Sequence, residues 1–138
     1  MTKSSVRNMV VGSSVIVFGV FLFMTYLSHN TFAERSNADK ITERVALGKH
    51  VWEKHACIDC HTLLGEGAYY APELGNVIKR RGEEGTREIL QMAAEQGWGT
   101  DRRMPQFDLS EEEIEALVEF FTWMGNVDTD NWPPNIEG

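Results

Sequence analysis

The sequence predicts an all-α protein in which one transmembrane helix precedes a small helical domain. A run of nineteen residues without a charged side chain occupies positions 9–27. After this run, three segments place apolar residues at helical spacing, and no stretch alternates apolar and polar residues over six positions as a half-buried strand would. The 138 residues suffice for one domain plus such an appendage.

The uncharged run from Met9 to Leu27 has the length of a membrane span. At about 1.5 Å per residue, a helix of this length roughly matches a hydrocarbon core of about 30 Å. A cleaved signal peptide is the alternative, because Thr31-Phe32-Ala33 is similar to a cleavage site, but the apolar core of a signal peptide usually has only about 7–15 residues. We therefore expect a retained anchor in residues 1–28 and an external domain in residues 29–138 that ends in a C-terminal tail.

Charge is distributed unevenly on the two sides of the anchor. Lys3 and Arg7 precede it, whereas all 21 acidic residues and 11 of the 13 basic residues follow it, which gives residues 29–138 a net charge of −10. Basic residues mark the cytoplasmic side of a membrane span. We therefore expect a single-pass protein of a bacterial inner membrane, with a cytoplasmic N-terminus and a periplasmic domain. A domain with this negative charge repels nucleic acid and anionic lipid, and it indicates a basic protein partner that docks transiently. Solubility or a saline habitat explains the charge nearly as well.

Three segments of the external domain are predicted to be helical. The first covers about 37–56, and its apolar face consists of Ile41, Val45, Gly48, Trp52 and Ala56. The second covers about 84–95. The third begins at a Ser-Glu-Glu-Glu capping box at residue 110 and ends at Gly125, and its apolar face consists of Ile114, Leu117, Val118, Phe121 and Met124. The segments 62–82 and 97–109 lack periodicity, and loops of such length usually carry function, so we expect a large apolar cofactor to complete a thin core.

The pentapeptide CIDCH holds both cysteines of the chain and admits four kinds of chemistry. A disulfide across two residues would constrain the unfolded chain little, and a thioredoxin-type pair needs a preceding strand. Zinc needs four ligands, with the remaining histidines as candidates. A covalent haem explains every residue, because two thioethers at this spacing match the vinyl groups of one porphyrin edge and His61 follows as an iron ligand. We therefore expect haem c on Cys57 and Cys60.

The second axial ligand decides whether the iron is open to small molecules or closed as in an electron carrier. Met92 and Met124 fall within the predicted helices, where core packing explains them. Met104 lies instead in the polar stretch GTDRRMPQFDLS and is followed by Pro105, which stiffens the chain. We therefore predict His61 and Met104 as the axial ligands.

The helix before CIDCH, the stretches YAPEL and RMPQF, and the last helix together resemble a class I cytochrome c. This resemblance implies a fold wrapped around the haem. It also implies that the Pro72 carbonyl holds the ring N–H of the proximal His61. In such proteins a glycine of the first helix packs against an aromatic residue of the last, which here implies Gly48 against Phe120 or Phe121.

Nearly the whole chain, including GKHVWEKHACIDCHTLLGEGAYYAPELGNV and the terminal DTDNWPPNIEG, resembles the cytochrome c subunits of bacterial nitric oxide reductases. The resemblance implies a small, non-catalytic subunit that accepts electrons from a soluble cytochrome c or cupredoxin. The resemblance further implies that this small subunit passes the electrons to a large multi-helix subunit, which holds b-type haems and a non-haem iron and reduces NO to N2O. The resemblance also implies a calcium ion near the subunit interface, bound partly by the Gly67 carbonyl and by Tyr69. A hydrophobic docking patch at Tyr69 and Tyr70 is the alternative.

Other interpretations stay open. A free-standing, membrane-anchored cytochrome c that shuttles electrons would carry the same motif, as would the cytochrome c subunit of a haem-copper oxidase. Co-purification with a large partner would distinguish a subunit from a shuttle. A zinc- or thiol-based interaction module is the third alternative, and it would be colourless.

Overall fold

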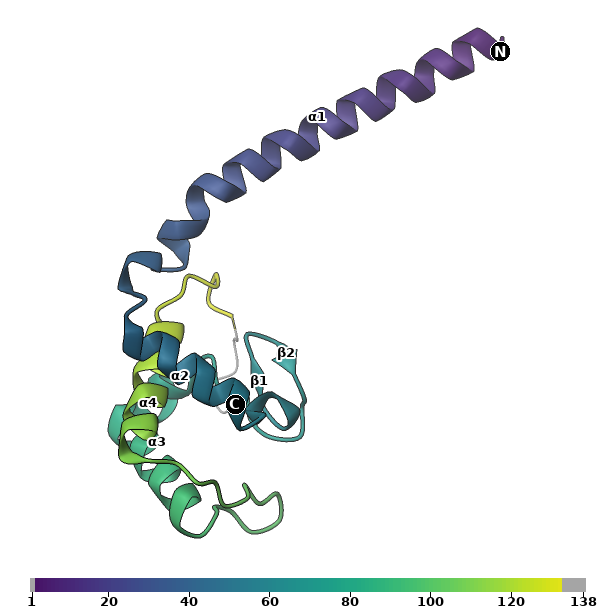
Figure 1. The fold of residues 1–138 in the computed structure, drawn as a ribbon. Helices are drawn as coiled ribbons and strands as arrows, with labels where there is room; N and C mark the ends of the chain where they lie inside the picture. Colours follow the sequence, from purple (N-terminus) through teal and green to yellow (C-terminus); the bar gives the residue numbers. More distant parts are fainter. Residues whose placement is uncertain (1, 133–138) are drawn as a thin grey trace. The chain divides into compact units, whose positions relative to one another are not determined.

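The computed structural model describes residues 2–132, and the chain divides into two units, Met1–Arg35 and Ser36–Gly138 (Figure 1). The last part of the predicted tail, PPNIEG, lies outside the described residues. The first unit consists of one helix, α1 (Lys3–Arg35), in which no residue is buried. Its mean hydropathy reaches 2.2 over 18 residues, so α1 is long and apolar enough to be a candidate membrane span.

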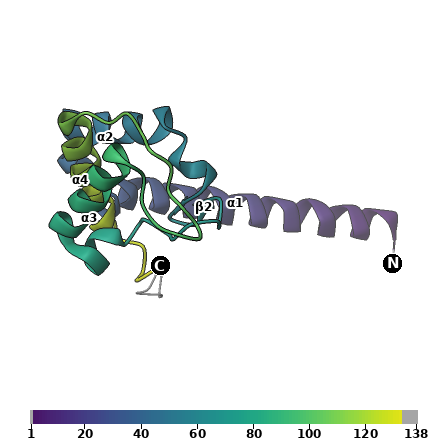
Figure 2. The same ribbon diagram turned by 90° about the horizontal axis from the view of Figure 1, so that it is seen from below.

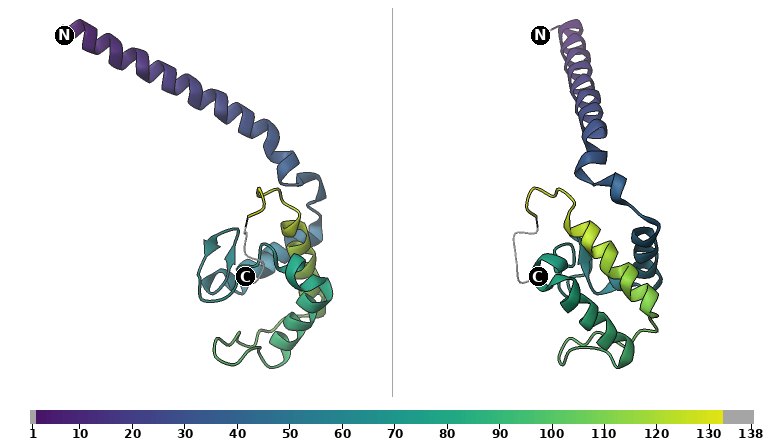
Figure 3. Two further views of the ribbon diagram at one scale, coloured as in Figure 1. Left: turned by 180° about the vertical axis from the view of Figure 1, so that it is seen from behind. Right: turned by 90° about the vertical axis from the view of Figure 1, so that its left-hand side faces the viewer.

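The second unit is built from three helices, α2 (Glu43–Lys54), α3 (Val77–Glu95) and α4 (Glu111–Gly125). Two short 3-10 turns, η1 (Ala38–Lys40) and η2 (Cys57–Asp59), flank α2, and a small hairpin of β1 (Thr62–Leu63) and β2 (Glu66–Gly67) follows. Helix α4 packs against both α2 and α3 (Figures 1 and 3). The structure is therefore mostly helical, which confirms the predicted all-α class.

Helices α2 and α4 approach each other most closely at Gly48. A Cβ atom at this position would overlap with the Ala116 carbonyl oxygen and lie 2.6 Å from the Cβ of Phe120. Phe120 is only 1 % exposed, and its ring centroid lies 5.6 Å from that of Phe121. The absent side chain of Gly48 thus permits the helix crossing, and the aromatic partner expected for this glycine is Phe120.

Apolar side chains of the three helices form one core. Its buried members are Val45, Val51, Trp52, Val77, Leu90, Ile114, Leu117, Val118, Phe120, Phe121 and Met124. The predicted apolar face of α4 is therefore buried in full, including Met124. Trp52 of α2 meets Phe121 edge to face, with 5.9 Å between the ring centroids, so α2 and α4 share the centre of this core.

The start of α4 follows from a reciprocal pair of hydrogen bonds. The Glu113 backbone N–H donates to Oγ of Ser110 over 3.3 Å, and the Ser110 backbone N–H donates to Oε2 of Glu113 over 2.9 Å. These bonds satisfy two N–H groups that a helix end otherwise leaves without a partner. The capping box predicted at residue 110 is confirmed.

The first predicted helix is shorter than its periodicity suggested. Thr42 caps α2, because its side chain accepts a hydrogen bond from the Val45 N–H over 3.1 Å. Ile41, expected on the buried face, precedes this cap and is 49 % exposed. At the other end the helix stops at Lys54, and Ala56 adopts a left-handed φ of 50°. Local hydrogen bonding by Thr42 therefore outweighs the apolar spacing at this end.

Helix α3 is longer than predicted, because it begins at Val77 within a segment expected to lack structure. Gly82, with φ 73° and ψ 170°, interrupts it with a non-helical residue. Only glycine adopts such a backbone conformation readily. The helical pattern is broken at Gly82, so the sequence reveals only the part of α3 that follows.

Candidate cofactor-binding site

The segment that follows α2 brings the two cysteines and His61 into one tight turn. The backbone N–H groups of Cys60 and His61 both donate to the Cys57 carbonyl oxygen, over 3.2 and 2.9 Å. Both cysteines are free and half-buried. Burial, together with the nearby Cys60, raises the pKa of the Cys57 thiol to about 11, so this thiol is protonated at neutral pH. No disulfide joins the two sulfur atoms.

The ring of His61 is oriented by Pro72. Nδ1 of His61 lies 2.8 Å from the Pro72 carbonyl oxygen. A carbonyl can only accept, so Nδ1 carries the proton and Nε2 keeps its lone pair. Burial lowers the pKa of His61, and the charge of Arg80 adds to this effect, while the bond to Pro72 opposes it. The neutral imidazole with a free Nε2 is the form that binds a metal.

Main-chain hydrogen bonds hold the Pro72 segment beside the cysteine turn. Three N–H groups of residues 68–74 donate to carbonyls of residues 58–62: Ala68 to Ile58 (3.0 Å), Ala71 to Cys60 (2.8 Å) and Leu74 to Thr62 (2.9 Å). The His61–Pro72 bond lies between two of these contacts along the chain. The Pro72 carbonyl, which accepts the hydrogen bond from the His61 ring, therefore lies in a segment that main-chain hydrogen bonds hold against the cysteine turn.

Gly67 and Tyr69, the residues expected at a calcium ion, lie in and just after β2. Gly67 pairs with Thr62 and has a φ of 122°. A Cβ atom there would overlap with the His61 carbonyl oxygen. Tyr69 is 78 % exposed, and its hydroxyl lies 3.4 Å from the Gly65 carbonyl oxygen. Within residues 2–132, no three His, Cys, Asp or Glu side chains are gathered as a metal site would need.

Met104 lies on the long connection between α3 and α4, beside the core. Its backbone forms an isolated antiparallel bridge with Trp98, and the Phe107 N–H donates to the Ala93 carbonyl over 3.1 Å. The Met104 side chain is half-buried and packs against the core cluster, whereas Arg103 next to it is exposed. The thioether is therefore directed inward from an otherwise polar connection.

The connection between α3 and α4 also reaches the segment that follows the hairpin (Figure 2). Nη1 of Arg102 donates to the Tyr70 carbonyl oxygen over 3.1 Å, and the guanidinium carbon lies 5.7 Å from the centroid of the Tyr70 ring. The chain segments that carry Met104 and Pro72 are thus joined by a direct contact.

A buried nitrogen atom without a partner lies between the cysteine segment and the Met104 segment. Nε2 of His55 is inaccessible to solvent and has no hydrogen-bond partner among the described residues. The His55 ring meets Phe107 edge to face, with 5.6 Å between centroids. An unsatisfied buried polar atom costs about 1–3 kcal/mol, so a polar group bound at this place would stabilise the domain. The free thiols, the neutral imidazole, the inward thioether and this nitrogen together fit a covalently attached haem.

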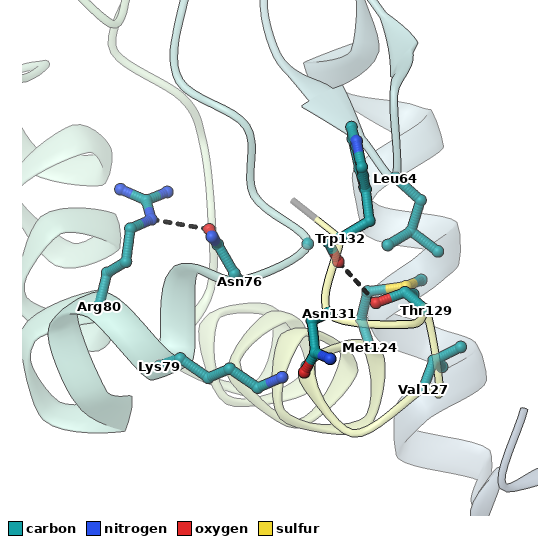
Figure 4. A pocket seen from close by; sticks show the side chains of 11 residues that line it. Leu64, Asn76, Lys79, Arg80, Met124, Val127, Thr129, Asn131 and Trp132 are labelled. Atoms are coloured by element: carbon teal, nitrogen blue, oxygen red, sulfur yellow. Dashed lines mark hydrogen bonds between the residues drawn. The ribbon is translucent and has the colours of Figure 1, made fainter. Parts of the chain in front are cut away.

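A separate cavity of about 620 Å³ lies between the hairpin turn, the start of α3 and the end of α4 (Figure 4). Leu64, Arg80, Met124 and Trp132 are among the side chains that line it. His61 and Met104 do not line it. Met124 therefore belongs to the core and to this cavity, which agrees with the interpretation of Met124 as a packing residue.

Comparisons with known proteins agree with this geometry. The chain matches the cytochrome c family over residues 45–125. It is similar to the nitric oxide reductase C subunit of Stutzerimonas stutzeri, with 50 % identity over 99 % of this chain and 97 % of the relative. It is also similar to the proteins of that name from Paracoccus denitrificans (45 % identity, 100 % of this chain, 97 % of the relative) and Halomonas halodenitrificans (40 %, 100 % and 97 %).

Proposed function

The chain belongs to the cytochrome c family and within it to the nitric oxide reductase C subunits, and from this membership we propose that it is the electron-transfer subunit of a respiratory nitric oxide reductase. The observation that carries the proposal is the C-x-x-C-H turn whose His61 ring donates to the Pro72 carbonyl. In this role the chain does no bond chemistry itself. It relays electrons to a catalytic subunit that reduces NO to N2O.

Four side chains hold the cofactor in this proposal. Cys57 and Cys60 supply the two thioether attachments, Nε2 of His61 is the proximal ligand, and the Met104 thioether is the distal one. When bound, the haem supplies a one-electron carrier with no open iron position, and a methionine ligand raises its potential. The Pro72 carbonyl holds the proton on Nδ1 of His61, so that Nε2 stays available to the iron.

The membrane arrangement is proposed from charge and hydropathy. The part of helix α1 up to residue 28 crosses a bacterial inner membrane once, with Lys3 and Arg7 on the cytoplasmic side, and the last turns of α1 extend beyond this span to Arg35. Residues 29–138 then form the periplasmic haem domain. This arrangement lets a soluble electron donor reach the haem domain while α1 stays beside the catalytic subunit.

The partners are proposed from the family and the charge. The large partner is the multi-helix catalytic subunit, and the electron donor is a soluble cytochrome c or a cupredoxin. The net charge of −10 on residues 29–138 favours a donor with a basic docking face and makes the encounter dependent on salt.

A calcium ion at the interface with the catalytic subunit is proposed on the Gly67 carbonyl and Tyr69. Ca²⁺ takes about 6–8 oxygen ligands. The two residues lie two positions apart, and the side chain of Tyr69 is exposed, so its hydroxyl is accessible from outside the domain. Most of the ligands would therefore come from the partner subunit, and the ion would bind only in the assembled complex.

Co-expression with the catalytic subunit tests the proposed function. We expect the wild-type chain to carry haem c, to co-purify in detergent with the large subunit, and to support NO consumption with a reduced soluble donor. The Cys57→Ala/Cys60→Ala double variant should lose that donor-driven activity, while a small reductant that reduces the catalytic subunit directly still supports it. A haem-loaded chain that purifies alone would indicate a free-standing shuttle. Consumption of O2 instead of NO would indicate an oxidase subunit.

A further inference from the structure

The carboxylate of Glu73 joins three backbone N–H groups from two separate segments. Oε1 accepts from the Leu64 N–H over 2.8 Å and from the Gly75 N–H over 2.7 Å. Oε2 accepts from the Gly65 N–H over 3.2 Å. Hydrogen bonds to an ionised acceptor are about twice as strong as neutral ones, so Glu73 fastens the hairpin turn to the start of α3.

The turn that Glu73 holds is a strained one. Leu64 and Gly65 both have positive φ, 53° and 84°. Two consecutive positive φ values are typical of type I′ hairpin turns, which favour glycine, asparagine and aspartate. For a leucine such a conformation is unfavourable, because its Cβ comes too close to the following carbonyl oxygen. The hydrogen bonds from Glu73 to the N–H groups of both residues offset this strain.

Gly75 packs closely against the Glu73 carboxylate and the Leu64 side chain. A Cβ atom on Gly75 would lie 2.8 Å from Oε1 of Glu73 and 2.9 Å from Cδ2 of Leu64. Because these distances are shorter than real Cβ contacts, a side chain at Gly75 would displace the carboxylate or the turn. The absence of a side chain at Gly75 therefore permits the Glu73 carboxylate to reach the turn.

The main chain of Glu73 is held as well as its side chain. Nη2 of Arg80 donates to the Glu73 carbonyl oxygen, and Nε of Arg80 donates to Oδ1 of Asn76 over 2.8 Å. The Glu73 nitrogen and the Pro72 carbonyl belong to one planar peptide group. Holding Glu73 by its carboxylate and its carbonyl therefore fixes one edge of this peptide group and restricts the direction of the Pro72 C=O bond.

We propose that Glu73 is the positioning residue of the proximal ligand: it orients the Pro72 carbonyl that accepts the Nδ1 proton of His61. This inference rests on the proposed role of His61 as an iron ligand. A hydrogen bond to the outer nitrogen of a ligating histidine fixes its ring and makes it a stronger donor, and a stronger donor favours the oxidised iron. Loosening Glu73 thus weakens the His61–Pro72 bond and raises the midpoint potential.

The test compares Glu73→Gln with Glu66→Gln in the full-length, haem-loaded chain. Both variants remove one negative charge, and Glu66 is exposed on β2, so Glu66→Gln controls for net charge. Because the charge of Glu73 itself acts on His61, Glu73→Asp, which keeps that charge, separates its effect on the potential from the loss of the hydrogen bonds. The measurements are the midpoint potential and the solvent exchange of the His61 Nδ1 proton, followed by NMR of the reduced protein. We expect a higher potential than in the control, and proton exchange roughly tenfold faster, as for the loss of one hydrogen bond.

Three results decide the matter. If Glu73→Gln matches Glu66→Gln in potential and in proton exchange, Glu73 has no role toward His61, whatever happens to the thermal stability. If Glu73→Gln does not mature, Glu73→Asp takes its place, because it keeps the charge but withdraws the carboxylate by one methylene. It should raise the potential with no change in net charge, and an unchanged potential would overturn the inference. A wild-type chain without haem, or without the weak long-wavelength absorption band of iron–methionine ligation, would instead contradict the proposed function.

Discussion

Trp98 and Met104 are joined by two backbone hydrogen bonds. The Trp98 N–H donates to the Met104 carbonyl over 3.0 Å, and the Met104 N–H donates to the Trp98 carbonyl over 2.7 Å. This pair closes the exposed residues between them into a loop and holds the backbone of Met104 at its base. A thioether is a weak iron ligand, so a fixed backbone would reduce the entropy lost if Met104 binds the iron as predicted.

Replacing Met104 should remove the methionine ligand from the iron. We expect Met104→Ala to keep the covalent haem c spectrum but to lose the weak long-wavelength band of iron–methionine ligation in the oxidised protein. The controls are Met92→Leu and Met124→Leu, volume-conserving changes in α3 and in the core that should keep the band. If Met104→Ala keeps the band and one of the controls loses it, the ligand is a helical methionine.

Removing Arg102 should loosen the Met104 loop without unfolding the domain. Its contacts with the carbonyl and the ring of Tyr70 link this loop to the Pro72 segment. We expect Arg102→Ala to speed the displacement of the methionine ligand by added imidazole roughly fivefold, as for the loss of about 1 kcal/mol. Arg44→Ala removes the same charge from the exposed pair with Glu119 and should leave the rate unchanged. Equal rates in both variants would show that the Arg102–Tyr70 contact does not restrain the ligand.

A methyl group at Gly48 should disrupt the crossing of α2 and α4. We expect Gly48→Ala to lower the free energy of unfolding by about 3 kcal/mol, because the new atom would overlap with the backbone of Ala116. Gly85→Ala is the matched control within α3, where a Cβ would meet only the Cβ of Arg81, at 3.5 Å. It should raise the stability by about 0.5–1 kcal/mol. Denaturant unfolding of both variants measures these free energies. If Gly85→Ala lost as much stability as Gly48→Ala, the close contact between α2 and α4 would not be the cause of the loss.

The capping carboxylate of Glu113 should make the stability depend on pH. The hydrogen bond from Lys54, followed by that from the Ser110 N–H, lowers the pKa of Glu113 from 4.5 to about 2. A lowered pKa means that the folded state favours the ionised form, so this contribution is complete above pH 4.5 and disappears as the pH falls to about 2. We expect Glu113→Gln to cost about 1 kcal/mol at pH 7.

Unfolding measured across this pH range gives the decisive comparison. The wild type and Glu113→Gln should converge in stability as the pH falls from 4.5 to about 2. Glu112→Gln is the control, because Glu112 lies in the same first turn of α4. Its free energy of unfolding should stay closer to that of the wild type at each pH. A difference between the wild type and Glu113→Gln that stays constant down to pH 2 would contradict the assigned cause.

Features set by neighbouring residues could be predicted from the sequence. The capping box at Ser110 and the buried face of α4 depend on spacing along one helix, and both are present. The CIDCH turn is likewise local, whereas the role of Pro72 came from the family resemblance, because spacing does not specify which carbonyl His61 meets. The assignment of His61 and Met104 as iron ligands stays a prediction.

Other features depend on contacts that leave no pattern in the sequence. Nothing in the periodicity singles out Glu73, because its partners are backbone N–H groups, which every residue but proline carries. The signal in the sequence was weak, an acidic residue directly after Pro72 and two positions before Gly75. The start of α3 was missed for a similar reason, since a positive φ at Gly82 interrupts the helical spacing.

The pairing of α2 with α4 also sets an order of events during folding. These are the first and last α-helices of the domain, so the core cannot close until nearly the whole domain is available to fold. Before that moment Cys57 and Cys60 belong to an open polypeptide, and the burial that keeps the Cys57 thiol protonated in the folded domain is absent. The Cys57 thiol is therefore more reactive in the interval before α4 folds onto α2. The fold thereby defines a time window for attaching the cofactor, which ends when the last helix docks.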